Sequence, residues 1–168
     1  MALQYRGRIT FHHQSTYWKK LKQLEKAVND GEILKKAIYQ GAGIVADKVY
    51  EKMEALPEEE FRRLRPGETF HGVPKGQKKD LLEHYGTTQI ERDNYGFYHT
   101  KIGFEGFGDY PTKDYPQGIP IPLLAASIES GSSVRQKMPF IEPAVKETRK
   151  QAIEAMEKVI DDEIKKIF

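Results

Sequence analysis

Residues 126–145, ASIESGSSVRQKMPFIEPAV, constrain the fold more than any other part of the sequence. Gly131 can adopt the positive φ that ends a helix, and Pro143 suits the first position of a new helix, where no backbone N–H is needed. Pro139 forces the residue before it into extended geometry, and Phe140 with its neighbour forms a large apolar plug. The block therefore predicts a helix stop, an extended connector and a new helix start.

Apolar residues recur every three or four positions in four segments, as they do on the buried face of a helix. The predicted helices run from Ser15 or Thr16 to Val28, from Glu32 to Leu56, from about Pro122 to Ser130, and from Pro143 to near Phe168. Gly41 and Gly43 lie inside the second helix, where each costs about 1 kcal/mol relative to alanine. Either another backbone lies close against that turn, or the glycines are tolerated weak positions.

Strand signals are shorter and fewer. Apolar and polar residues alternate from Leu3 to Phe11, which predicts a first, half-buried strand with Gly7 as a bulge. Residues 87–92 and 97–104 favour strands and flank the turn sequence Asp93-Asn94-Tyr95-Gly96. They are predicted to form a hairpin.

Two segments are predicted as long loops. Residues 57–80 contain three prolines and alternating blocks of charge, although Pro57 followed by three glutamates is also typical of a short helix start. Residues 105–120 are rich in glycine and proline. We expect both to be mobile loops that reach partner proteins.

These elements predict one α+β domain spanning residues 1–168. We expect a small antiparallel sheet of about three strands, with two long and two short helices packed on one face. The chain has no cysteine, so disulfides and thiolate sites are excluded, and its net charge is +2. No apolar run is long enough for a membrane span and the N-terminus lacks a secretory signal, so we expect a cytoplasmic protein without membrane contact.

No pattern in the sequence predicts catalysis, a cofactor or a metal. His12 and His13 are adjacent in a predicted strand and so point to opposite faces, where they cannot share one ion. Ser130 and its neighbouring serines lack the strand-turn-helix setting of a hydrolase nucleophile. The glycines between Gly103 and Gly108 lack the surrounding fold of a dinucleotide site. We therefore expect a protein that is not an enzyme.

One basic cluster leaves a second class of function open. The residues that make up this candidate assembly arm, with the aromatic residues among them, are Phe61, Arg62, Arg63, Arg65, Phe70, Lys75, Lys78 and Lys79. Basic and aromatic side chains together are typical of surfaces that bind single-stranded nucleic acid. Interspersed acids and the small net charge argue against it. The alternative function is that of a module that binds nucleic acid or a host factor.

The last block and the helices resemble the minor tail component and tail-completion family of long-tailed bacteriophages, proteins of the neck where head and tail meet. The similar text is KKAIYQGAGIVADKVYEKMEALP in the second helix and SIESGSSVRQKMPFIEPAVKETRKQAIEAM towards the C-terminus. The positions that match the family pattern are Glu129, Gly131, Ser133, Pro139, Phe140, Pro143 and Ala144. Two departures are Ser132, where threonine is usual, and the missing Thr-Gly before Leu81 or Leu82.

The resemblance implies a structural role in the virion, in its tail or neck, without catalysis or cofactor, for a protein made in the bacterial host cytoplasm. The implied partners are other copies of the chain in a ring, the head connector or tail tube, and the tail terminator proteins. The matched residues would then shape the subunit or its interface, and the two loops would reach the neighbours.

Overall fold

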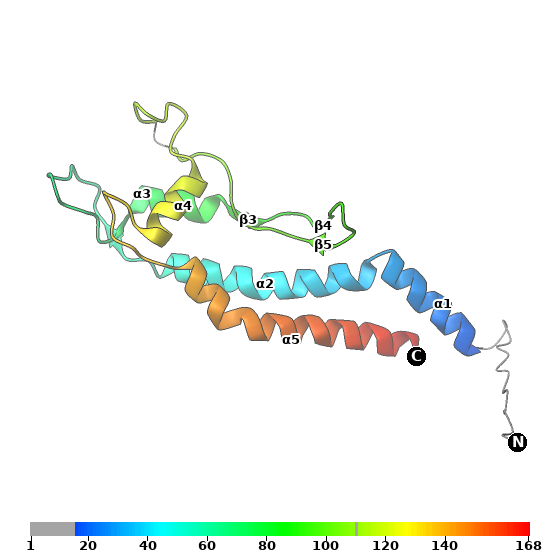
Figure 1. Ribbon diagram of the computed structural model, residues 1–168. Helices are drawn as coiled ribbons and strands as arrows, with labels where there is room; N and C mark the ends of the chain where they lie inside the picture. The colour runs from blue at the N-terminus through cyan, green and yellow to red at the C-terminus, as the bar shows by residue number, and fades with distance from the viewer. Residues whose placement is uncertain (1–15, 110) are drawn as a thin grey trace, which may run out of the picture.

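The computed structural model describes residues 16–109 and 111–168. It is an elongated molecule built on two long helices, α2 (Glu32–Glu54) and α5 (Ile141–Ile167), which lie side by side (Figure 1). Two short helices, α3 (Lys75–Glu83) and α4 (Ile121–Ser130), sit at one end of this pair, and α1 (Thr16–Asn29) extends from the other end. The four predicted helices are confirmed, and α3 is a fifth that the sequence did not indicate.

α1 and α2 are separated by a tight turn that the hairpin of residues 91–99 covers. Gly31 has a φ of 70°, and a Cβ there would overlap the ring of Tyr98. The same ring has Lys35 Nζ 5.3 Å from its centroid and the Arg92 guanidinium 5.6 Å from it. Glycine is therefore required at this turn both by the backbone geometry and by the aromatic ring packed on it.

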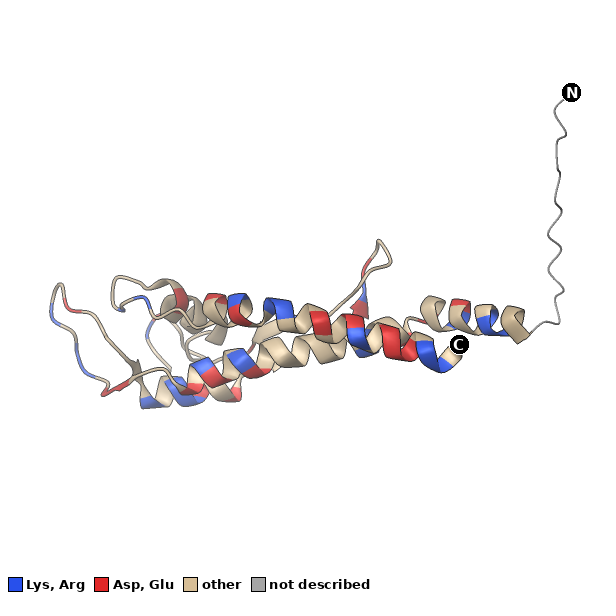
Figure 2. Cartoon of the chain, turned by 90° about the horizontal axis from the view of Figure 1, so that it is seen from below, with Lys and Arg blue, Asp and Glu red and all other residues tan. Residues whose placement is uncertain are grey.

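α2 and α5 are held together by small residues at their crossing and by ion pairs at their edges. A Cβ on Gly41 would lie 2.6 Å from Met156 Sδ and 3.3 Å from the carbonyl oxygen of Ala152, so α5 approaches the α2 backbone closely there. Lys52 Nζ lies 2.7 Å from Glu147 and Lys36 Nζ 3.2 Å from Glu163. Both signs of charge alternate along the helices (Figure 2).

The two glycines of α2 differ, and a pair of substitutions separates them. The close approach anticipated from the sequence is confirmed for Gly41, whereas a Cβ on Gly43 would meet nothing within 4 Å. We expect Gly43→Ala to raise the free energy of unfolding by about 0.5 to 1 kcal/mol, because alanine is the better helix former. Gly41→Leu should lower it by about 1 to 3 kcal/mol, because the new side chain is forced against α5. Urea unfolding of both variants measures the difference. Equal effects would contradict the close packing at Gly41.

The described strands form three separate pairs of two or three residues. β1 (Glu58–Glu59) pairs in parallel with β2 (Val73–Pro74), β3 (Tyr85–Thr87) pairs antiparallel with β6 (Ile102–Phe104), and β4 (Glu91–Arg92) pairs antiparallel with β5 (Tyr98–His99). The hairpin is confirmed, and Asp93 stabilises its turn by accepting hydrogen bonds from the amides of Tyr95 and Phe97.

The strand pairs and α3 correct three expectations, and a fourth is not tested. The class is mixed α+β as predicted, but the described strands do not form one sheet with the helices on one face. The predicted strand from Leu3 to Phe11 lies outside the described residues. The helix start at Pro57 is wrong: the Pro57 carbonyl accepts a hydrogen bond from Val73, which draws the segment into a parallel strand pair. The predicted loop at 57–80 likewise includes β2 and the first six residues of α3.

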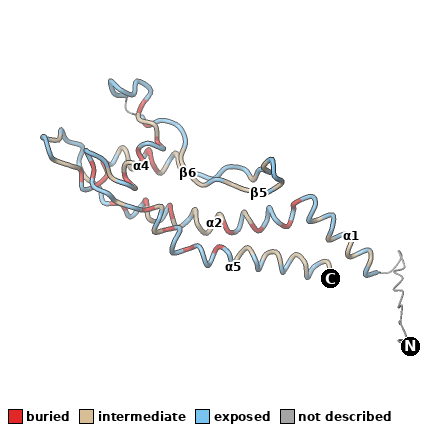
Figure 3. Tube along the Cα trace, in the orientation of Figure 1, coloured by how far each residue is buried: buried red, intermediate tan, exposed pale blue. Residues whose placement is uncertain are grey.

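The main core lies at the α3–α4 end of the molecule, where buried segments gather (Figure 3). It consists of residues from the end of α2 and just after it, from β2, from α3 and α4, and from the start of α5. Its members are Val49, Met53, Leu56, Val73, Leu81, Ile121, Leu124, Ala125, Ile128, Phe140 and Ala144. α1, by contrast, has no buried residue. Among the described helices, none is long and apolar enough to cross a bilayer.

Candidate functional site

The most elaborate joint in the molecule connects the end of α4 to the start of α5, and Glu129 is at its centre. One carboxylate oxygen of Glu129 accepts hydrogen bonds from the amides of Phe140 at 2.7 Å and Ile141 at 2.8 Å, and the other accepts the amide of Glu142 at 2.9 Å. The first amides of a helix have no partner within it, and they carry the positive end of its dipole. Glu129 therefore caps α5 from a different helix.

Phe140 anchors the same joint on its apolar side. Its side chain is 1% exposed, and its ring lies 6.1 Å from that of Phe104 in an edge-on arrangement. Ala144, one turn further along α5, is fully buried. Met138 donates its amide to the Ile128 carbonyl at 2.8 Å, which ties the connector to α4. The predicted apolar plug is confirmed, and residues 136–140 contain no helix or turn, as predicted. The first part of the connector differs, because Ser132 and Arg135 exchange two backbone hydrogen bonds and so close a tight turn.

The remaining residues of the sequence pattern have simpler positions. Gly131 follows α4 with a φ of 78°, as predicted, and a Cβ on it would lie 3.0 Å from the Lys137 amide nitrogen. Pro139 and Ser133 are exposed. Pro143 is the third residue of α5 rather than the first, because the Glu129 cap allows the helix to begin at Ile141.

Arg135, in the middle of the connector, fastens it to the segment before α3 and to α3 itself. It is 5% exposed, and it donates hydrogen bonds to the Gly72 carbonyl at 3.1 Å and to Gln77 Oε1 at 2.6 Å. Its guanidinium lies 5.7 Å from the ring centroid of Phe70. Burial lowers the pKa of Arg135, and the negative charge of Glu59 opposes that effect. The connector is thus fixed by a buried cation whose partners are neutral groups and an aromatic face.

Glu59 organises the segment between α2 and α3. Its Oε2 accepts the amides of His71 at 2.7 Å and Gly72 at 3.0 Å, and its Oε1 lies 3.3 Å from Arg62 Nε. These hydrogen bonds, from His71 first and then from Gly72 and Arg62, lower the pKa of Glu59 below its ordinary value of 4.5, with burial acting in the opposite direction. These contacts therefore hold the start and the end of the segment between α2 and α3 together.

This arrangement predicts an acid-sensitive contribution to stability. Because the pKa of Glu59 is lower in the folded state, its contribution is present above pH 4.5 and is lost as the pH falls through the folded pKa. We expect Glu59→Gln to lower the melting temperature near neutral pH and to do so less at about pH 3. Glu60→Gln, an exposed neighbour, is the matched control and should change little. Equal losses at both pH values would contradict this role for the Glu59 charge.

The eight candidate arm residues fall into two groups: Phe70 and Lys78 are buried or partly buried, and the other six are exposed. Phe70 is buried beneath Arg62 and Arg135, and Lys78 donates to the Leu56 carbonyl and pairs with Glu58. The exposed members are Phe61, Arg62, Arg63, Arg65, Lys75 and Lys79. Phe61 is 76% exposed although its ring stacks 6.0 Å from that of Phe70. Of the exposed side chains, Arg62 already pairs with Glu59 and Glu68, and Lys79 pairs with Glu83. Phe70 and Lys78 hold the start and the end of the segment between α2 and α3 in place.

Residues 105–120 form a loop whose two ends are joined. The amide of Gly108 donates to the Ile119 carbonyl at 2.9 Å, and the amide of Ile121 donates to the Gly106 carbonyl at 3.0 Å. Asp80, which is 3% exposed, accepts the amide of Asp109 at 3.2 Å and so attaches the loop to α3. The loop projects from the α3–α4 end of the molecule (Figure 1). As predicted, it has no helix or strand in its described part.

A groove of about 880 Å³ separates this loop from the segment that follows α2. Its wall includes β1 and residues Glu60 and Phe61 on one side, the first turns of α3, and Ile121 and Leu124 of α4. Most of its surface is apolar, whereas Glu58, Glu59, Glu60 and Asp80 contribute carboxylates. Its apolar lining and its carboxylates are complementary to a segment with apolar and basic side chains.

Sequence reasoning missed Arg135, Asp80 and the groove. An arginine inside the connector carries no periodic signal, and Asp80 lies among charges typical of a solvated helix face.

Within residues 16–109 and 111–168, no group of three or more potential ligand side chains is placed to hold a metal ion. The contacts of Glu129, Arg135 and Glu59 join separate segments of the chain, and the groove is open to a partner. No protein-family model matches the chain, and no curated protein or solved structure matches it either.

Proposed function

We propose that this chain is a non-enzymatic structural protein of a bacteriophage or prophage particle. In this proposal it joins or completes the tail at the junction of head and tail, as one subunit of an oligomeric ring. The expected neighbours are further copies of itself and the connector, tube or terminator proteins on either side of that ring.

The observation that carries the proposal is the joint between α4 and α5. Four of the seven residues through which the chain resembles phage tail-completion proteins take part in it, namely Glu129, Gly131, Phe140 and Ala144. Glu129 caps α5, and Gly131 forms the turn after α4. Phe140 and Ala144 anchor the start of α5 in the core. The resemblance therefore rests on residues that form one built unit rather than on scattered identities.

The surface of the molecule offers further support. A ring subunit must present different surfaces to its neighbours, and an elongated shape with two projecting segments and a groove at one end provides them (Figure 1). The alternative, a module for nucleic acid, has less in its favour. Arg62 of the basic cluster already pairs with Glu59 and Glu68, and Lys78 with Glu58. A salt-dependent shift of DNA by the purified protein would favour that alternative.

Deletion of the gene from the phage or prophage tests the proposal. We expect electron micrographs of the lysate to show separate filled heads and finished tails, restored to whole particles when the gene is supplied from a plasmid. Whole infectious particles without the gene would contradict the proposal.

We also expect the isolated protein to be monomeric and to assemble only on its partner. Light scattering of the purified protein checks this expectation, and a ring in solution without partners would contradict it.

A further inference from the structure

We propose that the groove of one copy receives residues 3–11 of a second copy, so that neighbouring subunits are joined head to tail. The inference deepens the proposed function, on which it rests for its setting in a ring. It depends on the position of the groove, on the reach of residues 3–11, and on the charges of both. Residues 3–11 lie outside the described residues and enter only through their sequence.

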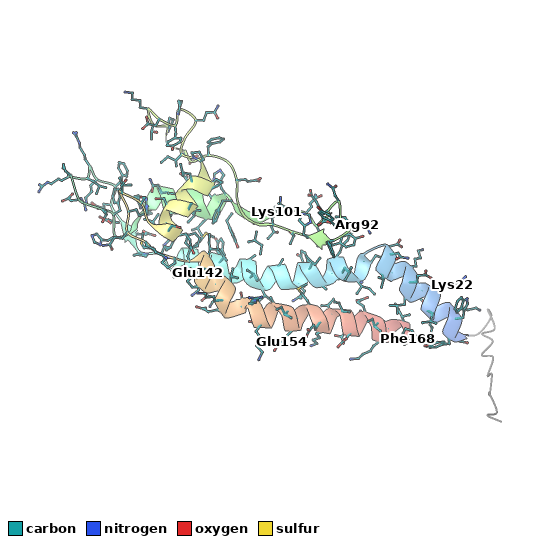
Figure 4. The ribbon with its side chains drawn as sticks, viewed as in Figure 1. Lys22, Arg92, Lys101, Glu142, Glu154 and Phe168 are labelled. Atoms are coloured by element: carbon teal, nitrogen blue, oxygen red, sulfur yellow. The ribbon has the colours of Figure 1, made fainter. Side chains whose placement is uncertain are left out.

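The proposed contact joins two parts that lie far apart within one molecule. Thr16, where α1 begins, and the groove lie at opposite ends of the molecule, and Figure 4 shows the same separation between Lys22 on α1 and Glu142 near the groove end. α2 has 23 residues and α1 has 14, which correspond to about 34 Å and 21 Å at 1.5 Å per residue. The two helices continue in roughly the same direction (Figure 1).

A chain can span at most about 3.6 Å per residue. The middle of the segment, Gly7, is nine residues from Thr16 and can thus lie no more than about 32 Å from it. That distance is shorter than the path to the groove of the same molecule. A segment centred on Gly7 can therefore fill such a groove only in another copy, and this holds wherever the chain begins.

Residues 3–11 and the groove are complementary in charge and polarity. Residues 1–24 contain no aspartate or glutamate, and the predicted strand alternates apolar residues with Arg6 and Arg8. The groove has an apolar wall that includes Phe61 and Ile119 and an acidic edge along residues 58–60. Glu60 has no ion-pair partner among the described residues, so its charge is available to an incoming arginine. An extended segment with one apolar face and one basic face matches both features.

The backbone of β1 is a further feature that suits an extended segment. β1 lies in the wall of the groove and pairs only with β2 among the described strands. A strand with one paired edge can add a further strand on its other edge, which is a recurrent way for a protein to bind an extended segment. The predicted strand of residues 3–11 has the alternation that such pairing needs.

The contact that results is heterologous, because the groove end of one copy meets the opposite end of the next. Repetition of such a contact closes into a ring when the rotation between neighbours allows it. α1, which precedes α2 and has no buried residue, would carry residues 3–11 towards the neighbour. The length of the subunit would therefore set the distance between the grooves of successive copies.

The absence of cysteine from the chain allows a clean cross-linking test. One full-length variant, Ile9→Cys, is mixed with a second, Phe61→Cys, whose position on the groove wall is 76% exposed. Under mild oxidation we expect a disulfide between the two different chains, which mass spectrometry identifies. A disulfide traps a weak encounter, so the test works while the protein is monomeric. The control mixes Ile9→Cys with Lys150→Cys, whose side chain on α5 is 89% exposed.

The mixed disulfide should form with Phe61→Cys at least about tenfold faster than with Lys150→Cys, the ratio that corresponds to about 1.4 kcal/mol of preference. Arg8→Glu in the first chain or Glu60→Arg in the second should remove most of that excess, and the two changes together should restore it. Equal rates at both positions, or an excess that no charge reversal alters, would overturn the inference. Such a failure would leave the gene-deletion phenotype unchanged, so it can be distinguished from failure of the proposed function.

Discussion

Phe140→Ala is expected to lower the free energy of unfolding by about 3 to 5 kcal/mol, the largest loss for any substitution considered for this chain. The side chain is 1% exposed and contacts the Phe104 ring within the core that α4 and α5 share. Alanine would leave a cavity at the point where α5 joins that core. Urea unfolding followed by circular dichroism measures the change.

The matched control is Phe97→Ala, a substitution of the same type on a side chain that is 71% exposed. It should change the free energy of unfolding by no more than about 0.5 kcal/mol. If Phe140→Ala were as mild as this control, Phe140 would face solvent or a partner rather than the core. The anchor role would then be contradicted.

Glu129→Ala is expected to lower the free energy of unfolding by about 2 to 3 kcal/mol. The substitution leaves the amides of Phe140, Ile141 and Glu142 without their acceptor and removes a negative charge from the positive end of the α5 dipole. Glu129→Gln keeps an oxygen acceptor but no charge, so its effect should be intermediate. The expected order of stability is therefore wild type, glutamine variant, alanine variant.

Glu154→Ala serves as the control for Glu129. Glu154 lies on α5 with a side chain that is 61% exposed and pairs only within its own helix, with Lys150. Its loss should cost less than about 0.5 kcal/mol. Amide hydrogen exchange gives a second readout, because the amides of residues 140–142 should lose protection in Glu129→Ala before those in the middle of α5. Unchanged protection would show that Glu129 does not cap the helix.

The helices could be predicted from the sequence because their signals are local. The period of apolar residues predicted the bounds of α1 and α2 to within about two residues. The turn at Gly131 and the burial of Phe140 followed in the same way from backbone preference and apolar size. The sequence left two explanations open for Gly41 and Gly43, and each explanation applies to one of them: α5 lies close to Gly41, whereas Gly43 has open space.

The parts that could not be predicted depend on contacts between distant residues. β1 exists because Pro57 and Glu59 bond to residues 71–73, and no local pattern in three glutamates indicates a parallel strand. Glu129 matched a sequence pattern, but its role as a cap appears only when α4 and α5 meet. The groove likewise forms from four segments that the chain brings together. Each of these features requires the tertiary arrangement.

The most direct test of the account is a cryo-electron microscopic reconstruction of the neck of the intact phage particle that carries this gene. The account predicts several copies of the α2–α5 helix pair arranged around the channel axis where head and tail meet. It also predicts extended density from each copy in the groove of the next. A resolved neck without any copy of this chain would contradict the central claim that the protein joins the two parts of the particle.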